Sequence, residues 1–209
     1  DGMPWYSPVN EVEYDPEGAK ALLDEWGWPA GPDGIRVRGA SGMKLSLTIY
    51  YIVGDSVRQG LAAELANQLR ELGIQADLKG VGWDTAYDDA LFNPLVWGWG
   101  AHTPMELYNI YHTEIYGDLA NTARYSPYSN ERADELMDAA LACTDLEESY
   151  ALWQQAQEEI AGDVPWVWLV NVDHLYWVRD GLAVAEQKIH PHGHGWSIVN
   201  NVDRWEWDV

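Results

Sequence analysis

The stretch Lys44-Leu45-Ser46-Leu47-Thr48-Ile49-Tyr50-Tyr51-Ile52, with the residues that follow it to position 81, decides the fold. Large apolar residues alternate along it with more polar ones, which is typical of a β-strand with one face packed more deeply. After the capping sequence Gly54-Asp55-Ser56 a helical stripe covers residues 57–72, and a second strand is predicted from residue 74 to residue 78. Strand, helix and strand at this spacing predict a parallel pair with a right-handed crossover, and so an α/β fold. The predicted deeper strand face holds Leu45, Leu47, Ile49 and Tyr51, and the stripe holds Val57, Leu61, Leu65, Leu69 and Leu72.

Further helices are predicted on both sides of this unit. Asp15-Pro16-Glu17 combines an N-cap residue, a proline in the first turn and an acidic residue, and therefore starts a helix that ends at Gly27. A helical pair is predicted over residues 129–161, capped by Ser129 and by Thr144-Asp145, and its short connection makes it antiparallel. The remaining predictions are a loop over residues 29–43, a short helix over 83–91, strands over 166–170 and 175–178, and a turn at Asp180-Gly181.

The composition excludes several classes of partner. The 209 residues contain 12 lysines and arginines against 34 aspartates and glutamates, a formal net charge of −22. No nucleic-acid partner is expected, because phosphates need a basic face, and the same charge opposes docking on anionic lipid. The single cysteine, Cys143, which the pattern places within a helix, excludes an internal disulfide and any CxxC motif. No apolar run reaches the roughly 18 residues that a membrane span needs.

The segment from Pro94 to Pro104 is the candidate binding site. Its sequence Trp97-Gly98-Trp99-Gly100-Ala101-His102 sets large rings beside bare backbone, where a predicted strand runs out into a turn. Glycine lets a ligand approach the backbone closely, and ligands of open α/β sheets bind where strands end. Trp97 and Trp99 are two apart, so they are predicted to face a solute together, with Gly100 beside them and His102 at the rim. The alternative is an aromatic strand buried in the core.

Histidines near the C-terminus form the densest set of possible metal ligands. His190, His192 and His194 alternate along the chain, and imidazole is the commonest ligand for ions such as Ni²⁺ or Zn²⁺. The alternative is a polar segment that holds no metal.

Two looser groups of polar residues are expected to be structural. They are His112 with Glu114 and Asp118, and Asp173 with His174. For catalysis the chain offers no GxSxG or HExxH motif and no privileged pair of carboxylates, so no enzyme activity is expected.

Four stretches, in order along the chain, resemble the C-terminal lobe of the extracellular solute-binding proteins of ABC importers, in the peptide and nickel class called family 5. They are Tyr14-Asp15-Pro16 through Gly27-Trp28, residues 62–74, Trp97-Gly98-Trp99-Gly100-Ala101, and Tyr128-Ser129-Asn130 through Asp163-Val164-Pro165. Together they cover nearly the whole chain in the order that the family shows.

The resemblance implies a periplasmic-binding-protein-like (type II) lobe, a mixed sheet flanked by helices, over residues 1–209. It implies a longer protein with an N-terminal lobe, toward which residues 187–209 cross. It also implies capture of oligopeptides, nickel or other metal chelates, or a related small solute for an ABC permease. The place would be the extracellular side of the cytoplasmic membrane, either the periplasm or a lipid-anchored position at the cell surface. No cofactor is implied, and Ni²⁺ or Zn²⁺ would enter only as cargo.

One position departs from the family pattern. Peptide binders of the family place an aspartate just after the cleft strand, where it pairs with the amino terminus of the peptide, and this chain has His102 there. A neutral imidazole is a poorer partner for an ammonium group than a carboxylate is. The exchange favours metal chelates or uncharged solutes over free peptides.

Two alternatives from other classes stay open at this point. A free-standing, aromatic-rich carbohydrate-binding module would bind glycan without a second lobe. A fragment of an acidic hydrolase would lose activity when one of two close carboxylates is neutralised.

Overall fold

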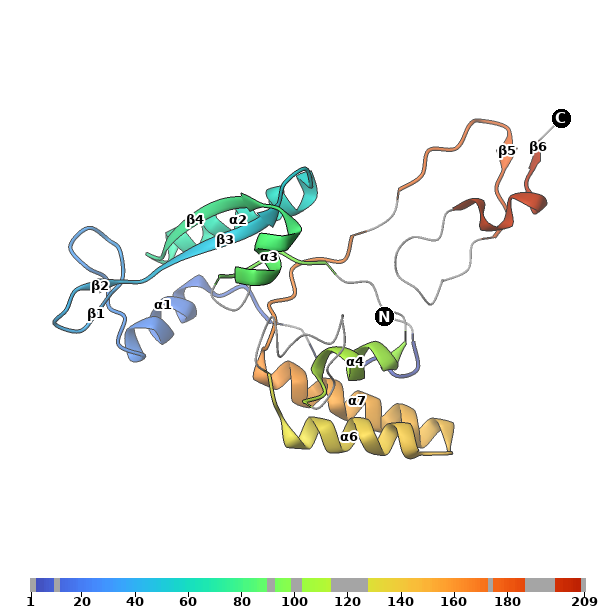
Figure 1. Cartoon of the computed structure of the whole chain (residues 1–209), viewed down its shortest axis with the longest axis horizontal. Helices are drawn as coiled ribbons and strands as arrows, with labels where there is room; N and C mark the ends of the chain where they lie inside the picture. Colours follow the sequence, from blue (N-terminus) through green and yellow to red (C-terminus); the bar gives the residue numbers. More distant parts are fainter. Residues whose placement is uncertain are drawn as a thin grey trace. The chain divides into compact units, whose positions relative to one another are not determined.

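A computed structural model describes residues 3–9, 12–89, 93–98, 103–113, 128–172, 175–186 and 198–207. Residues 8–97 belong to one compact unit, here called the sheet unit. Residues 1–7 and most of the chain after residue 97 belong to a second, here called the helical unit (Figure 1). The prediction that residues 1–209 form one lobe, with residues 187–209 crossing to another, stays a prediction.

The sheet unit is built on the predicted strand–helix–strand motif. Strand β3 (Ser46–Ile52) pairs in parallel with β4 (Gln75–Val81), in a register that runs from Ser46 opposite Gln75 to Ile52 opposite Val81. Helix α2 (Ser56–Glu71) connects the two strands. The prediction of a parallel pair over residues 44–81 is therefore confirmed.

A third stretch of chain runs parallel to β3 on its other side. The N–H of Tyr50 donates to the carbonyl of Pro94 at 2.7 Å, and the N–H of Val96 donates to the carbonyl of Tyr50 at 2.9 Å. This is one bridge, Tyr50 with Leu95, and the rest of the described segment 93–98 forms no strand. The predicted strand leading into the Trp-Gly sequence is thus reduced to a single point of pairing.

Both faces of β3 are covered by apolar residues. One face lies against α2, where Ile49, Ala62, Ala66, Ala76 and Val96 are buried. On the other face Tyr50, Ile52 and Val81 are buried with Ala86 of helix α3 (Trp83–Asp89). The predicted helical stripe is displaced by one residue, because the alanines make the closest approach to the sheet while Leu61, Leu65 and Leu69 pack partly buried beside them. Val57 is exposed.

The first helix begins where its cap predicts. Helix α1 (Pro16–Glu25) is capped by Asp15, whose Oδ1 accepts from the N–H of Gly18 at 2.8 Å. The stretch predicted as a loop over residues 29–43 contains two short strands, β1 (Val37–Arg38) and β2 (Met43–Lys44), which pair antiparallel.

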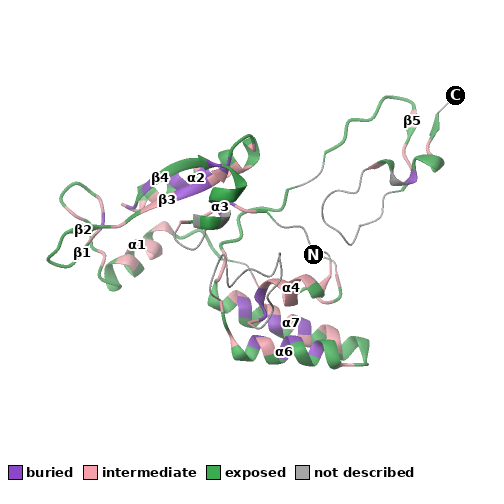
Figure 2. Cartoon of the chain, viewed as in Figure 1, coloured by how far each residue is buried: buried purple, intermediate pink, exposed green. Residues whose placement is uncertain are grey.

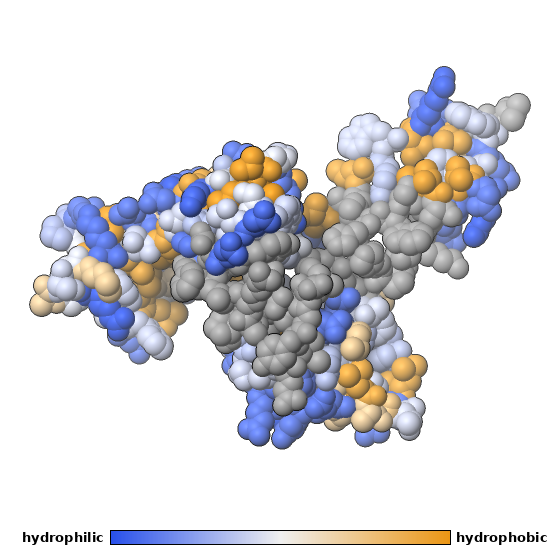
Figure 3. Space-filling model, viewed as in Figure 1, coloured by the Kyte–Doolittle hydropathy of each residue, from blue (hydrophilic) through white to orange (hydrophobic). Residues whose placement is uncertain are grey.

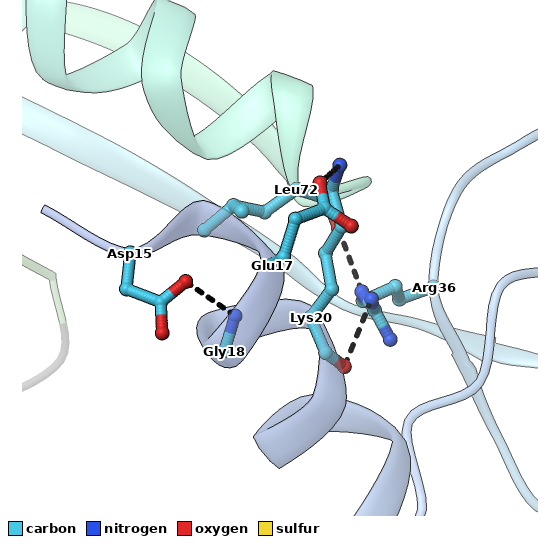
Figure 4. Close-up of polar contacts among 6 residues, drawn as sticks. All are labelled: Asp15, Glu17, Gly18, Lys20, Arg36 and Leu72. Carbon is cyan, nitrogen blue, oxygen red and sulfur yellow. Dashed lines mark hydrogen bonds and ion pairs between the residues drawn. The ribbon is translucent and has the colours of Figure 1, made fainter.

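Arg36 is a buried charged residue of the sheet unit, with 4% of its surface exposed. Its Nε donates to the carbonyl of Leu72 at 2.6 Å, and its Nη2 donates to the carbonyl of Lys20 at 3.2 Å (Figure 4). Its Nη1 donates to the carbonyl of Trp28 at 2.7 Å and to Oδ1 of Asp24 at 2.6 Å. One guanidinium therefore joins carbonyls from α1, from the loop after α1 and from the C-cap of α2. The Leu72 carbonyl is one of those that helix geometry leaves without an intrahelical partner at a C-terminus.

The helical unit confirms the predicted antiparallel pair. Helices α6 (Glu131–Ala142) and α7 (Leu146–Asp163) begin at the caps Asn130 and Asp145. Their buried residues lie between them, and helix α4 (Pro104–Tyr111) packs on both (Figure 2). The buried residues are Ala133, Leu136, Met137, Ala140, Trp153, Ala156 and Ile160.

Two details of the helical unit correct the predictions. The first cap is Asn130 and not Ser129, because the Asn130 side chain accepts from the N–H of Ala133 at 3.0 Å. Cys143 is the C-cap residue of α6 and does not lie within the helix. Residues 3–7, which show no sequence period, are held on α7, where Gln154 Nε2 donates to the carbonyl of Pro4 at 2.8 Å.

The chain after α7 differs most from prediction. Residues 166–170 and 175–178 form no strand, although the turn at Asp180-Gly181 is present. The strands described there are β5 (Leu182–Ala183) and β6 (Glu206–Trp207), which pair antiparallel and are joined through the 3₁₀ segment η1 (Ile198–Arg204). Apolar residues lie at the surface around β5 and β6 (Figure 3). Among the described residues from 165 to 181, between α7 and β5, the large exposed apolar residues are Val167, Trp168, Leu169, Val170, Val172, Leu175, Tyr176, Trp177 and Val178.

Candidate functional site

Three parallel stretches of the sheet unit end at the same edge. β3 ends at Ile52, β4 ends at Val81, and the bridged segment passes from Val96 into Trp97. The residues that follow these ends gather at one place, and this is the edge where open α/β sheets bind ligands. We call it the carboxyl edge and define it by Asp55, Arg58, Trp83 and Trp97.

Two indole rings meet at the carboxyl edge. The centroids of Trp83 and Trp97 are 5.4 Å apart with planes at 78°, the edge-to-face arrangement that aromatic rings prefer. Trp83 is 40% exposed and Trp97 is half-buried. Trp97 is therefore not a fully buried core residue, and the two rings offer apolar surface to a ligand.

Sequence reasoning missed Trp83, which it assigned only to the start of a short helix. Its position in the sequence, just after a predicted strand, could have identified it as a residue of the site. Trp83 comes two residues after the end of β4, and any residue at the end of a parallel strand reaches the same edge as the candidate after the neighbouring strand.

A charged pair, Asp55 and Arg58, lies next to the ring of Trp83. The Asp55 carboxylate forms an ion pair with the Arg58 guanidinium and also accepts from the Arg58 N–H at 2.9 Å, which caps α2. The guanidinium carbon lies 5.6 Å from the ring centroid of Trp83. The N–H of Arg58, and after it the guanidinium, hold the pKa of the Asp55 carboxyl below its ordinary value, and burial offsets only part of this.

We expect Asp55→Ala to lower the free energy of unfolding by about 1 kcal/mol at neutral pH, because the helix loses its cap. Since folding lowers the pKa of Asp55, the contribution of its charge is present above the ordinary pKa of 3.8 and is lost as the pH falls through the lower folded value. Urea unfolding of the two proteins at neutral pH and at steps below pH 4 should show the gap between them narrowing. Asp55→Asn, which keeps an acceptor oxygen, should cost less than alanine at neutral pH. A difference in unfolding free energy between wild type and Asp55→Ala that is the same at every pH would contradict a stabilising role for the charge of Asp55.

Most of the other predicted site residues lie outside the described residues. These are Trp99, Gly100, His102, His190, His192 and His194, together with Glu114, Asp118, Asp173 and His174. Their roles stay predictions. Across the described ranges no three His, Cys, Asp or Glu side chains are grouped so that they could hold a metal ion.

His112 lies in the helical unit, where it is buried, with 6% of its surface exposed. Its Nε2 is 3.4 Å from Oδ1 of Asp138, and its ring lies 4.4 Å from the ring of Tyr108, centroid to centroid. These neighbours give His112 a structural setting.

Comparison with known proteins places the chain in a family. The family model of bacterial extracellular solute-binding proteins, family 5 (middle region), matches residues 1–119. The chain belongs to this family. Protein XP55 of Streptomyces lividans is 32% identical over 85% of this chain and 32% of its own length. The oligopeptide-binding protein AppA of Bacillus subtilis is 27% identical over 94% of this chain and 35% of its own length. The chain thus spans about a third of these relatives.

Solved structures of the family share the fold. NikZ from Campylobacter jejuni, in complex with Ni(L-His), has a TM-score of 0.72 at 19% identity over 92% of this chain and 39% of its own. AppA from Bacillus subtilis, in complex with a nonapeptide, has a TM-score of 0.64 at 24% identity over 97% of this chain and 40% of its own. The predicted α/β fold of the type II periplasmic-binding-protein class is confirmed. No described helix combines the length and the apolar character that crossing a membrane requires.

Proposed function

We propose that this chain is the solute-facing part of the binding component of an ABC importer. In this role it captures a metal chelate or an oligopeptide on the outer side of the cytoplasmic membrane and presents it to a permease, and no bond is made or broken. Membership of family 5 supports the proposal, as do a relative named as oligopeptide-binding and one solved with Ni(L-His).

The observation that carries the proposal is the aromatic pair at the carboxyl edge. Trp83, the first residue of α3, and Trp97, which follows the bridged segment, meet where parallel strands end, with the Trp83 ring 40% exposed. Such rings supply apolar contact area at about 25 cal/mol per Å² of surface removed from water. Sites for small molecules bury about 70–90% of the ligand, so a second wall is needed, and closure of another lobe about a hinge would provide it.

The class of solute is inferred from position 102. A histidine there lacks the negative charge that holds a peptide amino terminus, whereas imidazole suits a chelated metal ion. We therefore place metal chelates ahead of free peptides.

Isothermal titration of the full protein that carries this chain tests the function. The probes are Ni(II) with L-histidine, a mixture of nonapeptides, and a hexasaccharide for the alternative of a sugar-binding module. Saturable binding of either of the first two, tightest for the nickel complex, is expected. Binding of none of them, or of the hexasaccharide alone, would reject the proposal. The 209-residue chain by itself should bind more weakly than the full protein, because one wall of the site is then missing.

The histidine cluster gives a separate prediction about metal. If His190, His192 and His194 take Ni²⁺ or Zn²⁺ directly, uptake should weaken as the pH falls through about 6.5, where imidazole gains a proton. Replacing all three by alanine should abolish that uptake, measured by titration with the free ion. Uptake that is unchanged in the triple variant would exclude these residues as ligands.

A further inference from the structure

We propose that Arg58 is a positioning residue for the solute-facing ring of Trp83. Its guanidinium, anchored by Asp55, fixes the tilt of the Trp83 ring against Trp97 before any solute arrives. This inference rests on the proposed function, since it names the residue that sets the geometry of the same edge.

The contacts form a continuous series within the sheet unit. Asp55 holds Arg58 twice, through the backbone N–H at 2.9 Å and through the ion pair with the side chain. The guanidinium carbon then lies 5.6 Å from the centroid of the Trp83 ring, within reach of a cation–π interaction. Trp83 in turn meets Trp97 edge to face at 5.4 Å. Each group thus limits the orientation of the next one.

The setting of Arg58 differs from that of an ordinary surface arginine. Only 25% of its side chain and 27% of that of Asp55 are exposed. Within the described part of the protein, its Nε is enclosed and has no hydrogen-bond partner. A cation that has lost part of its water interacts more strongly with an aromatic face. The flat guanidinium can bind a carboxylate and lie over a ring together, whereas the small ammonium group of lysine cannot do both equally well.

Trp83 needs such a support because its own element is short. It is the first residue of the seven-residue α3, and 40% of it is exposed. An exposed side chain loses rotamer freedom when a ligand packs on it, and this loss weakens binding. A ring held in advance by Arg58 has already lost that freedom, so binding is tighter.

The first arm of the test reads the ring directly and needs no solute. The full protein is labelled with 5-fluorotryptophan, and the Trp83 resonance is assigned through Trp83→Phe. Arg58→Gln should shift and broaden this ¹⁹F resonance, and Arg58→Lys should do so to a smaller extent. Arg70→Gln, on the same helix but near its other end, is the matched control and should leave it unchanged. A Trp83 resonance that is identical in wild type and Arg58→Gln would overturn the inference.

The second arm is a double-mutant cycle on solute affinity, using whichever of Ni(II)–L-histidine or the nonapeptides binds. Arg58→Gln should weaken binding about three- to tenfold in the wild type, the range for a partly desolvated cation–π contact. In the Trp83→Phe background, Arg58→Gln should weaken binding less than about twofold. The indole ring through which Arg58 acts is then replaced by a smaller ring that attracts a cation less. Equal losses in both backgrounds would mean that Arg58 acts independently of Trp83 and would overturn the inference.

The two proposals fail in different ways. If neither probe binds the unsubstituted protein, the proposed function fails, while the ¹⁹F arm still decides whether Arg58 positions the ring. If a probe binds and Trp83→Ala weakens it but Arg58→Gln does not, the function stands and this inference is wrong.

Discussion

Replacing Arg36 by alanine is expected to lower the free energy of unfolding of the sheet unit by about 3–5 kcal/mol, since it removes the guanidinium that a buried polar network shares. The guanidinium serves carbonyls of Lys20, Trp28 and Leu72, and each would be left without this partner inside the protein. Whole domains are stable by only about 5–15 kcal/mol, so the variant should lose most of its stability. Urea or thermal unfolding followed by circular dichroism measures the effect.

Two matched variants separate the contribution of the ion pair with Asp24 from that of the hydrogen bonds to the buried carbonyls. Asp24→Asn keeps an acceptor for Nη1 and removes only a carboxylate that is 59% exposed, so it should cost less than about 1 kcal/mol. Arg36→Lys should fall between the two, because one ammonium group cannot reach acceptors on several sides. If Arg36→Ala unfolds within about 1 kcal/mol of the wild type, the buried network does not hold the unit together.

Trp83→Ala should weaken solute binding to the full protein by about 1–3 kcal/mol, the usual range for an aromatic anchor in a binding site. The ring is 40% exposed before binding, so the solute covers apolar surface of Trp83 that the fold leaves in contact with water. Folding stability should therefore fall less than affinity does. Titration with Ni(II)–L-histidine or the nonapeptides gives the first quantity, and denaturant midpoints give the second.

Trp26→Ala is the control for the loss of an indole. Trp26 is the C-cap residue of α1 in the same unit and is 74% exposed, and it does not follow any of the three parallel stretches that end at the carboxyl edge. It should change neither affinity nor stability much. If Trp83→Ala instead collapses stability while the affinity of the folded fraction stays the same, Trp83 supports the core and the carboxyl edge is not the binding surface.

The parts of the fold that sequence could predict are those fixed by local chemistry. Asp15 and Asp145 cap helices through their own side chains, and the period-two pattern of β3 comes from its two faces. The parallel pairing of β3 and β4 follows from the spacing of strand, helix and strand. These features need no knowledge of distant residues.

The parts that sequence missed depend on distant neighbours. Large leucines marked the predicted face of α2, yet the closest approach to the sheet needs the small side chains Ala62 and Ala66. The apolar stretch 166–170, with two valines and two tryptophans, has strand propensity, but a strand also needs a neighbouring strand for its backbone hydrogen bonds. Arg36 and Trp83 act through groups far away in sequence, and neither carries a local motif.

The exposed apolar stretch after α7 bears on how the chain behaves in solution. Val167, Val170, Leu175 and Trp177 are 59–86% exposed, and such β-prone segments tend to associate between molecules. The net charge of −22 opposes this by mutual repulsion. Salt shortens the range of that repulsion to about 3 Å at 1 M, and acid removes it as the pH approaches 4.3. Light scattering of the 209-residue chain should therefore rise with added salt and near that pH, so dilute, neutral, low-salt buffer is the medium in which it stays dispersed.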